Sequence, residues 1–187
     1  MAKNKKAFAK RTLLQGLNEL YGRLMNISLV RIDDRLIHGQ ILETWLPFIK
    51  ASCIVVVDDN VANDFFRKSV IRMAVPSDVE VIVNSIEEFT KNCSHYEKQG
   101  KKTIVLFYDI HNALKAYSFG FKFEKLNIGS AHSKKNRKYY SPAVYLCKED
   151  IENLRFLVDS GVEVELRCIP RDKPLNFRDV IKKSKLT

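Results

Sequence analysis

Short apolar runs alternate with helix-like segments along the chain from residue 26 to its end. The runs 54–57 and 103–107 are almost continuously apolar, which is typical of strands buried on both faces of a parallel sheet. The pattern predicts strands at 26–31, 54–58, 80–84, 103–108, 125–128, 143–147 and 162–168. Apolar residues three and four positions apart predict helices at 39–49, 61–74, 86–96, 110–118, 148–160 and 176–183.

This alternation predicts an α/β fold with a single open, mainly parallel sheet of about seven strands and helices on both faces. A chain of 187 residues is long enough to bury the core of one such domain. Ligands of open α/β sheets bind outside the carboxyl ends of the strands. The polar residues that directly follow strands are therefore the first candidates for a site: 31–38, Asp58 to Asn60, Asp109, Gly129 with Ser130, and Arg171 with Asp172.

The first 24 residues differ in character from the rest of the chain. They carry six basic residues against one acidic residue, so this segment supplies +5 of the net charge of +10. Leu13, Leu17, Leu20 and Leu24 recur at helical spacing. We divide the chain into a basic extension at 1–24 and a domain at 25–187. The extension fits an amphipathic appendage, an additional packed helix, or a translation start mis-assigned upstream of Met25.

Composition excludes several classes of function. Half of the excess charge lies in the extension and exposed aromatic residues are not interleaved with the rest, so we expect no nucleic-acid partner. The four cysteines form no C-x-x-C pair, which favours reduced thiols over a zinc or redox site. No apolar run approaches the roughly 20 residues that span a bilayer, and no secretory signal opens the chain. We therefore expect a cytoplasmic protein.

The segment 29–40 is the most informative stretch of the chain. It begins as an apolar strand and turns at Asp33 and Asp34 before His38 and Gly39. We expect Gly39 at the start of the first helix, where free backbone N–H groups and the positive end of the dipole favour an anion. A neutral imidazole is a competent nucleophile toward phosphorus, and either aspartate could fix its tautomer.

Two arginines lie in the same segment, within seven positions of the histidine. Arg31 and Arg35 could neutralise the charge of a phosphoryl group that is transferred to His38. The segment therefore predicts a histidine that carries a phosphoryl group, with its electrostatic support close by in the sequence.

The stretch 30–40, Val-Arg-Ile-Asp-Asp-Arg-Leu-Ile-His-Gly-Gln, closely resembles a known active-site signature. This is the signature of the enzyme IIB component of the bacterial phosphoenolpyruvate-dependent sugar phosphotransferase system, mannose/fructose/sorbose family. The resemblance continues through 55–64, 126–129 and 161–167 with Pro170, and covers 25–187. It implies a mainly parallel sheet with helices on both faces, and homodimers are common in the family.

The resemblance also implies a function. His38 matches the histidine that accepts a phosphoryl group from the IIA component and passes it to sugar bound by the membrane IIC and IID components. Arg35 matches the arginine of the active-site loop, Arg31 and Asp33 lie in the same motif, and family transfer needs no metal or cofactor. The chain would work at the inner face of the membrane through IIC and IID. Further candidates for binding phosphate or a partner are Gly39, Gln40, Asp58, Gly129, Ser130 and Arg171.

The chain departs from the family pattern in two respects. Ser130 follows Gly129 where the family often has a second glycine, and the stretch 131–140 after it is unusually basic. Family IIB domains are sometimes fused behind a IIA domain, and residues 1–24 are too few to form one. We therefore expect a free-standing IIB component.

A receiver-like signalling module, phosphorylated on aspartate, is the alternative interpretation. Asp33, Asp34, Asp58 and Asp59 follow two successive predicted strands and could together form an acidic pocket for Mg²⁺. Two arginines would compete with the metal for these carboxylates. The chemistry of the product separates the two hypotheses, because phosphohistidine is labile to acid and an acyl phosphate is labile to base.

Overall fold

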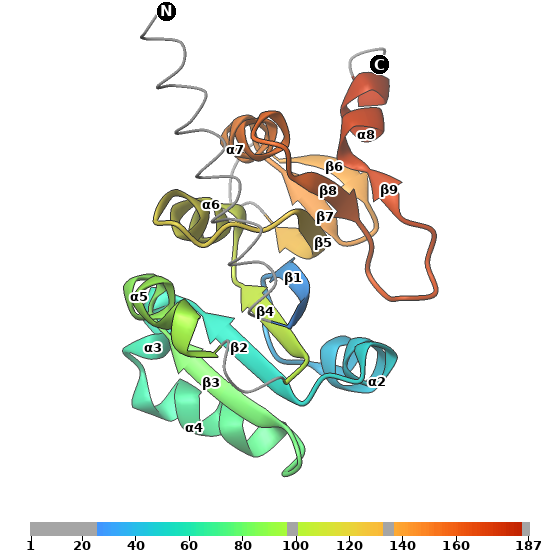
Figure 1. Cartoon of the computed structure of the whole chain (residues 1–187). Coiled ribbons are helices and arrows are strands. Elements are labelled where there is room, and N and C mark those ends of the chain that lie inside the picture. Colours follow the sequence, from blue (N-terminus) through green and yellow to red (C-terminus); the bar gives the residue numbers. More distant parts are fainter. Residues whose placement is uncertain (1–25, 97–100, 133–136, 185–187) are drawn as a thin grey trace, which may run out of the picture.

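The computed structural model describes residues 26–96, 101–132 and 137–184 (Figure 1). The predicted extension at 1–24 and part of the basic stretch 131–140 lie outside these ranges. The strands are β1 (Ile27–Asp33), β2 (Cys53–Val57), β3 (Glu80–Asn84), β4 (Thr103–Phe107), β5 (Lys125–His132), β6 (Lys138–Ser141), β7 (Val144–Leu146), β8 (Glu163–Leu166) and β9 (Leu175–Asn176). The helices are the π-helix η1 (Gln40–Trp45), α2 (Leu46–Ile49), α3 (Asp59–Ala62), α4 (Phe65–Ala74), α5 (Ile86–Tyr96), α6 (Ile110–Ser118), α7 (Lys148–Asp159) and α8 (Phe177–Ser184).

The strands form one sheet, in the order β3-β2-β4-β1-β5-β7-β6, with β8 paired to β5 and β9 to β8. All pairs are parallel except β6–β7 and β8–β9. Strand β5 has three neighbours because its first half pairs with β8 and its last two residues pair with β7. The predicted open, mainly parallel sheet is confirmed. The described ranges contain nine strands, two more than the seven predicted. The two additional strands are the short antiparallel strands β6 and β9.

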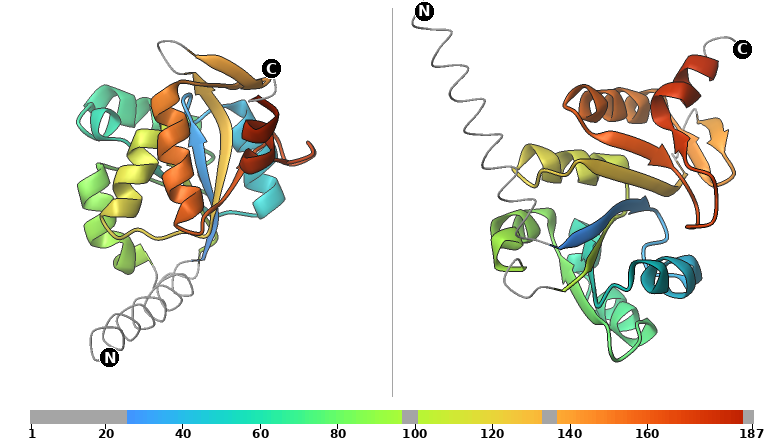
Figure 2. Two further views of the ribbon diagram at one scale, coloured as in Figure 1. Left: turned by 90° about the horizontal axis from the view of Figure 1, so that it is seen from above. Right: turned by 45° about the vertical axis from the view of Figure 1, so that its right-hand side comes forward.

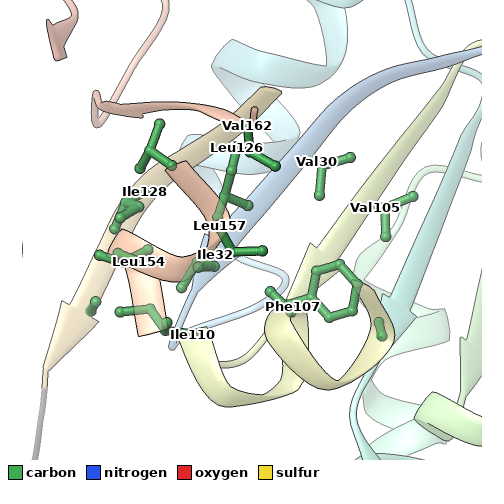
Figure 3. Close-up of a cluster of buried hydrophobic side chains, with 14 of the residues drawn as sticks. Val30, Ile32, Val105, Phe107, Ile110, Leu126, Ile128, Leu154, Leu157 and Val162 are labelled. Carbon is green, nitrogen blue, oxygen red and sulfur yellow. The ribbon is translucent and has the colours of Figure 1, made fainter. Parts of the chain in front are cut away.

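Helices cover both faces of the sheet, as predicted. Alternate residues of the central strands point in opposite directions, so Val55 and Val57 enter one core cluster while Ile54 and Val56 enter the other. The first cluster lies under α5, α6 and α7 (Figure 3), and the second lies under η1, α2 and α4. Figure 2 shows α5, α6 and α7 side by side. Each fully buried Val, Leu or Phe side chain contributes about 1.5–3 kcal/mol to this packing.

Two predicted helices differ in detail from the structure. The segment 61–74 is divided into α3 and α4 because the carboxylate of Asp64 accepts a hydrogen bond from Arg67 N (3.0 Å) and starts a new helix. The segment 39–49 begins as the π-helix η1 and continues as α2 to Lys50, whose φ of 56° ends it. Single-turn π-helices are frequent at functional sites, and η1 begins two residues after His38.

Strands β1, β2, β4, β5 and β8 run parallel, so their carboxyl ends meet at one edge of the sheet. The loop that carries His38 leaves β1 at this edge, which is where the strand order predicts a site. None of the helices in the described ranges has both the length and the apolar character that crossing a bilayer requires. The cysteines with described side chains are free: Cys53, Cys147 and Cys168.

Candidate functional site

The loop between β1 and η1 presents His38 at the sheet edge. Its first turn is closed by a hydrogen bond from Leu36 N to Asp33 O (3.0 Å). Leu36 has a φ of 54°, a conformation that costs a non-glycine residue free energy and persists only where the surroundings impose it. Its side chain is buried in the second core cluster and anchors the turn there. Gly39 is the N-cap of η1, which confirms the predicted start of the helix.

Asp33 orients the imidazole of His38. The Nε2 atom lies 3.0 Å from Asp33 Oδ1, and that oxygen also accepts a hydrogen bond from Arg35 N (3.2 Å). Burial alone raises the pKa of the Asp33 carboxyl, but the hydrogen bond from His38 and the charge of Arg31 outweigh it and hold this pKa below its usual value. An ionised carboxylate only accepts hydrogen bonds. In neutral His38, Nε2 therefore carries the proton and Nδ1 keeps its lone pair.

Arg31 is fully buried behind this pair, and all five of its N–H groups are used. Nε and Nη2 both donate to the same oxygen, Asp33 Oδ2, at 3.1 and 2.8 Å, which forms a buried ion pair with two hydrogen bonds. The remaining three donate to Asn127 Oδ1, to Arg167 O and to Cys168 O. Arg31 has no donor left for a phosphoryl group, so the charge support expected of it from the sequence stays a prediction and would act through Asp33. Its position instead fixes the carboxylate that orients His38.

Gly129 makes room for the Arg31 guanidinium. A Cβ atom at this position would lie 1.7–2.2 Å from the guanidinium atoms of Arg31, far inside van der Waals contact. Any side chain here would displace Arg31 from Asp33. The structure thus gives a reason for glycine at position 129, and its predicted binding of phosphate or a partner stays a prediction.

Ser130, the residue that departs from the family pattern, joins a second polar cluster at the same edge. Its Oγ donates to Asp34 Oδ1 (2.6 Å), and Asp34 Oδ2 lies 2.7 Å from His132 Nδ1. Asp34 N also donates to Ser130 O. Asp34 is therefore held by β5, and it is Asp33 that contacts His38. The serine hydroxyl is engaged within this cluster.

The remaining predicted residues are placed differently from one another. Arg35 is exposed, and its side chain has no ion pair or side-chain hydrogen bond within the described ranges. Gln40 is the half-buried first residue of η1. Arg171 is exposed in the connection from β8 to β9, with no hydrogen bond to His38, Asp33 or Arg35.

Asp58 does not join the site. Its Oδ1 accepts from Val61 N (2.8 Å) and caps α3, and its Oδ2 accepts from Asn112 Nδ2 (3.0 Å). Strand β2, which it follows, is separated from β1 by β4. Asp58 fixes the start of α3 against α6, and its predicted role in binding phosphate or a partner finds no support in this position.

The same separation weighs against the receiver-like alternative. Asp59 accepts from Ile86 N (2.8 Å) and pairs with Lys115 (3.1 Å), while Asp33 and Asp34 are held at β1. In the described part of the chain, no group of three or more acidic, cysteine or histidine side chains is arranged to hold a metal ion. The four aspartates of the alternative thus remain two separate pairs.

Three residues of the site were not predicted from the sequence: Trp45, Asn127 and Arg167. Trp45 Nε1 donates to Cys168 O (2.9 Å), and its ring centroid lies 5.3 Å from Arg31 Cζ and 5.6 Å from Arg167 Cζ. Arg167 Nε is buried and has no hydrogen-bond partner in the described ranges. A polar residue inside an apolar run was the available signal for Asn127. Arg167 lay inside the predicted strand 162–168, whereas β8 ends at Leu166.

Fold and site together define an α/β domain in which His38 stands at the carboxyl edge of a parallel sheet, oriented by a buried Asp–Arg pair. Residues 27–187 match the model of the family described as PTS system sorbose subfamily IIB component. The chain belongs to this family of phosphotransferases. Members receive a phosphoryl group from a IIA component and pass it to sugar through IIC and IID.

Similar proteins include relatives of different sugar specificity. The PTS system fructose-specific EIIB component of Bacillus subtilis (strain 168) is 32% identical over 85% of this chain and 98% of its own length. The crystal structure of the IIBSor domain of the sorbose permease from Klebsiella pneumoniae has a TM-score of 0.79 and 34% identity, covering 86% of this chain and 98% of that one. The PTS system mannose-specific EIIAB component of Escherichia coli (strain K12) is 31% identical over 85% of this chain and 49% of its own length.

Proposed function

We propose that His38 is the phosphocarrier residue of this IIB component. It accepts a phosphoryl group from the IIA component and passes it to a sugar held by the membrane IIC and IID components, at the inner face of the membrane. The observation that carries the proposal is the contact between His38 Nε2 and Asp33 Oδ1 at 3.0 Å. This contact leaves Nδ1 as the nucleophilic atom.

The first transfer moves the phosphoryl group from a nitrogen of the donor histidine to Nδ1 of His38. The lone pair of Nδ1 forms a bond to phosphorus while the N–P bond of the donor histidine breaks and its electron pair returns to the donor ring. The imidazole of His38 then gains positive charge, which the carboxylate of Asp33 stabilises through Nε2–H. In the second step the sugar hydroxyl attacks phosphorus and releases its proton to solvent, while the N–P bond breaks and its electron pair returns to Nδ1. Catalysis requires mainly positioning and charge stabilisation.

Two arginines are placed to support the charge of the phosphoryl group in different ways. Arg31 is confined to the buried pair with Asp33 and acts through that carboxylate. Arg35 is exposed on the His38 loop, and its side chain is not engaged by a described carboxylate. We assign to Arg35 the direct contact with the phosphoryl oxygens, because a free guanidinium matches their geometry.

The sugar is selected elsewhere in this proposal. The relatives named for fructose and for mannose are 32% and 31% identical to this chain, so neither specificity is favoured by similarity. A IIB component contacts the phosphoryl group and its protein partners, and the sugar itself is bound by IIC and IID.

Phosphorylation by a labelled IIA donor tests the proposal. We expect one phosphoryl group per chain, labile to acid and stable to base, attached to Nδ1 of His38. Chemical lability and nitrogen NMR of the labelled imidazole measure these properties. A base-labile product would indicate an acyl phosphate and the receiver-like alternative, and attachment to Nε2 would contradict the orientation by Asp33.

Arg35→Ala is expected to slow phosphoryl transfer by about 100-fold, because one charge-stabilising donor is lost from the transition state. Stability should change by no more than about 0.5 kcal/mol, since the side chain is exposed and the Arg35 N–H to Asp33 bond is kept. Arg155→Ala, an exposed arginine of α7, is the matched control. Rapid-quench transfer rates and urea unfolding provide the measurements, and equal rates for the two variants would remove Arg35 from the mechanism.

A further inference from the structure

Helix α4 exposes large apolar side chains to solvent. Phe65 is 81% exposed, Phe66 75%, Val70 43% and Met73 77%. Positions 66, 70 and 73 are three and four apart, so these side chains form one stripe, and Phe65 lies beside it. We call these four residues the α4 ridge. No residue of α4 is fully buried, and the helix contacts the core mainly through the half-buried Ile71.

Basic side chains flank the ridge. Arg67 and Arg72 are exposed and have no ion pair with any carboxylate among the described residues. At 100° per residue they fall on opposite sides of the ridge. Lys68 faces the body of the protein. Hydrogen bonds from Ser85 and the charge of Lys68 together lower the pKa of Glu88. Helix α4 itself contains no acidic residue.

A large apolar stripe with cations on both flanks is the arrangement of a helix that lies in a membrane interface. The aromatic side chains enter the boundary between headgroups and acyl chains, and the arginines pair with lipid phosphates. A soluble monomer seldom leaves so many large apolar side chains together in water. The charge pattern favours an anionic surface, because the two arginines have no counter-charge of their own.

We propose that the α4 ridge binds the surface of an anionic phospholipid bilayer, with Arg67 and Arg72 at the lipid phosphates. Helix α4 packs on the same face of the sheet as η1, and it begins at the carboxyl edge where His38 lies. It stands at the outer end of the sheet beside β3 (Figure 1). A short helix binds lipid reversibly, which suits a domain that also meets a IIA component. The proposal concerns lipid alone and does not depend on the role of His38.

Co-sedimentation of the full chain with vesicles tests the proposal. We expect binding to vesicles of phosphatidylglycerol with phosphatidylcholine, and little binding to phosphatidylcholine alone. Phe65→Ser/Phe66→Ser should weaken binding at least tenfold. Phe156→Ser on α7, where Phe156 is 54% exposed, is the matched control and should bind like the wild type. These variants keep the net charge, so any attraction from the basic segment 1–24 is equal in all of them.

The charged part of the proposal has its own variant. Arg67→Gln/Arg72→Gln is expected to weaken binding to the anionic vesicles by about fivefold for each cation removed. Lys173→Gln/Lys182→Gln removes two exposed cations from another part of the surface and should have a much smaller effect. Circular dichroism verifies that each variant is folded.

Three results would overturn the proposal. Equal vesicle binding by Phe65→Ser/Phe66→Ser and Phe156→Ser would attribute binding to net charge alone. If Phe65→Ser/Phe66→Ser changes the oligomeric state in sedimentation equilibrium and leaves vesicle binding unchanged, the ridge is the interface of the homodimer implied by the family resemblance. If the same variant accepts a phosphoryl group from IIA more slowly and binds vesicles as the wild type does, the ridge is a protein docking surface.

Discussion

His38→Ala is expected to abolish acceptance of a phosphoryl group from the IIA component while the protein stays folded. The variant lacks the nucleophile, and no other group in the loop can replace its Nδ1 lone pair. Asp33 keeps its ion pair with Arg31 and the hydrogen bond from Arg35 N, so no charge is left unpaired in the interior. The loss of stability should be about 1–2 kcal/mol, the range for one removed hydrogen-bond partner. Incorporation of labelled phosphate and urea unfolding measure the two effects.

His132→Ala is the informative control for this variant. His132 also pairs with an aspartate at the same sheet edge, since its Nδ1 lies 2.7 Å from Asp34 Oδ2. Its side chain is 42% exposed, against 8% for His38. We expect His132→Ala to accept phosphate at a rate close to that of the wild type. If His38→Ala is still phosphorylated on histidine, and the label disappears when His132 is also replaced, the assignment of the carrier residue is wrong.

The sequence predicted the sheet well because its signals are local. The central strands are continuous apolar runs, and a run of this kind identifies a buried strand without knowledge of its neighbours. Strand β9 has two exposed residues, and β6 is largely exposed. Such short strands exist only because a partner strand lies beside them. The division of 61–74 into α3 and α4 depended on the cap at Asp64, a residue with several alternative roles in a polar segment.

The site was predicted less completely than the fold, for a physical reason. Arg31 and Asp33 are two positions apart in a strand and therefore share a face, so their pairing follows from the sequence. The burial of this pair does not follow from the sequence, because burial depends on Trp45 and on the absence of a side chain at Gly129. Because it is buried, Arg31 contacts Asp33 and supports that carboxylate. The position of Asp58, two strands away from β1, also could not be predicted, because it depends on the order of the strands in the sheet.

Asp33→Asn is expected to damage both stability and phosphoryl transfer. The variant leaves the Arg31 guanidinium buried without its counter-charge, and breaking a buried ion pair in this way costs about 3–5 kcal/mol. An amide can donate a hydrogen bond to Nε2 as well as accept one from it, so it does not fix the tautomer of His38 that has its lone pair on Nδ1. In hydrolases the equivalent loss of an orienting aspartate slows reaction by about 10⁴-fold. We expect transfer to fall by a factor of about 10³ or more, measured below the unfolding temperature of the variant.

The pH dependence of stability separates this effect from a general defect. The pKa of Asp33 is lower in the folded protein than its ordinary value of 3.8, so the unfolded chain takes up a proton first as the pH falls. Asp33 therefore adds stability above about pH 4 and loses that contribution as the pH falls through its folded pKa. Urea unfolding between pH 7 and pH 3 should show a smaller acid-induced loss of stability in Asp33→Asn than in the wild type. Asp34→Asn, which removes a neighbouring carboxylate that faces Ser130 and His132, is the control. If Asp34→Asn slows transfer as much as Asp33→Asn does, His38 is not oriented by Asp33.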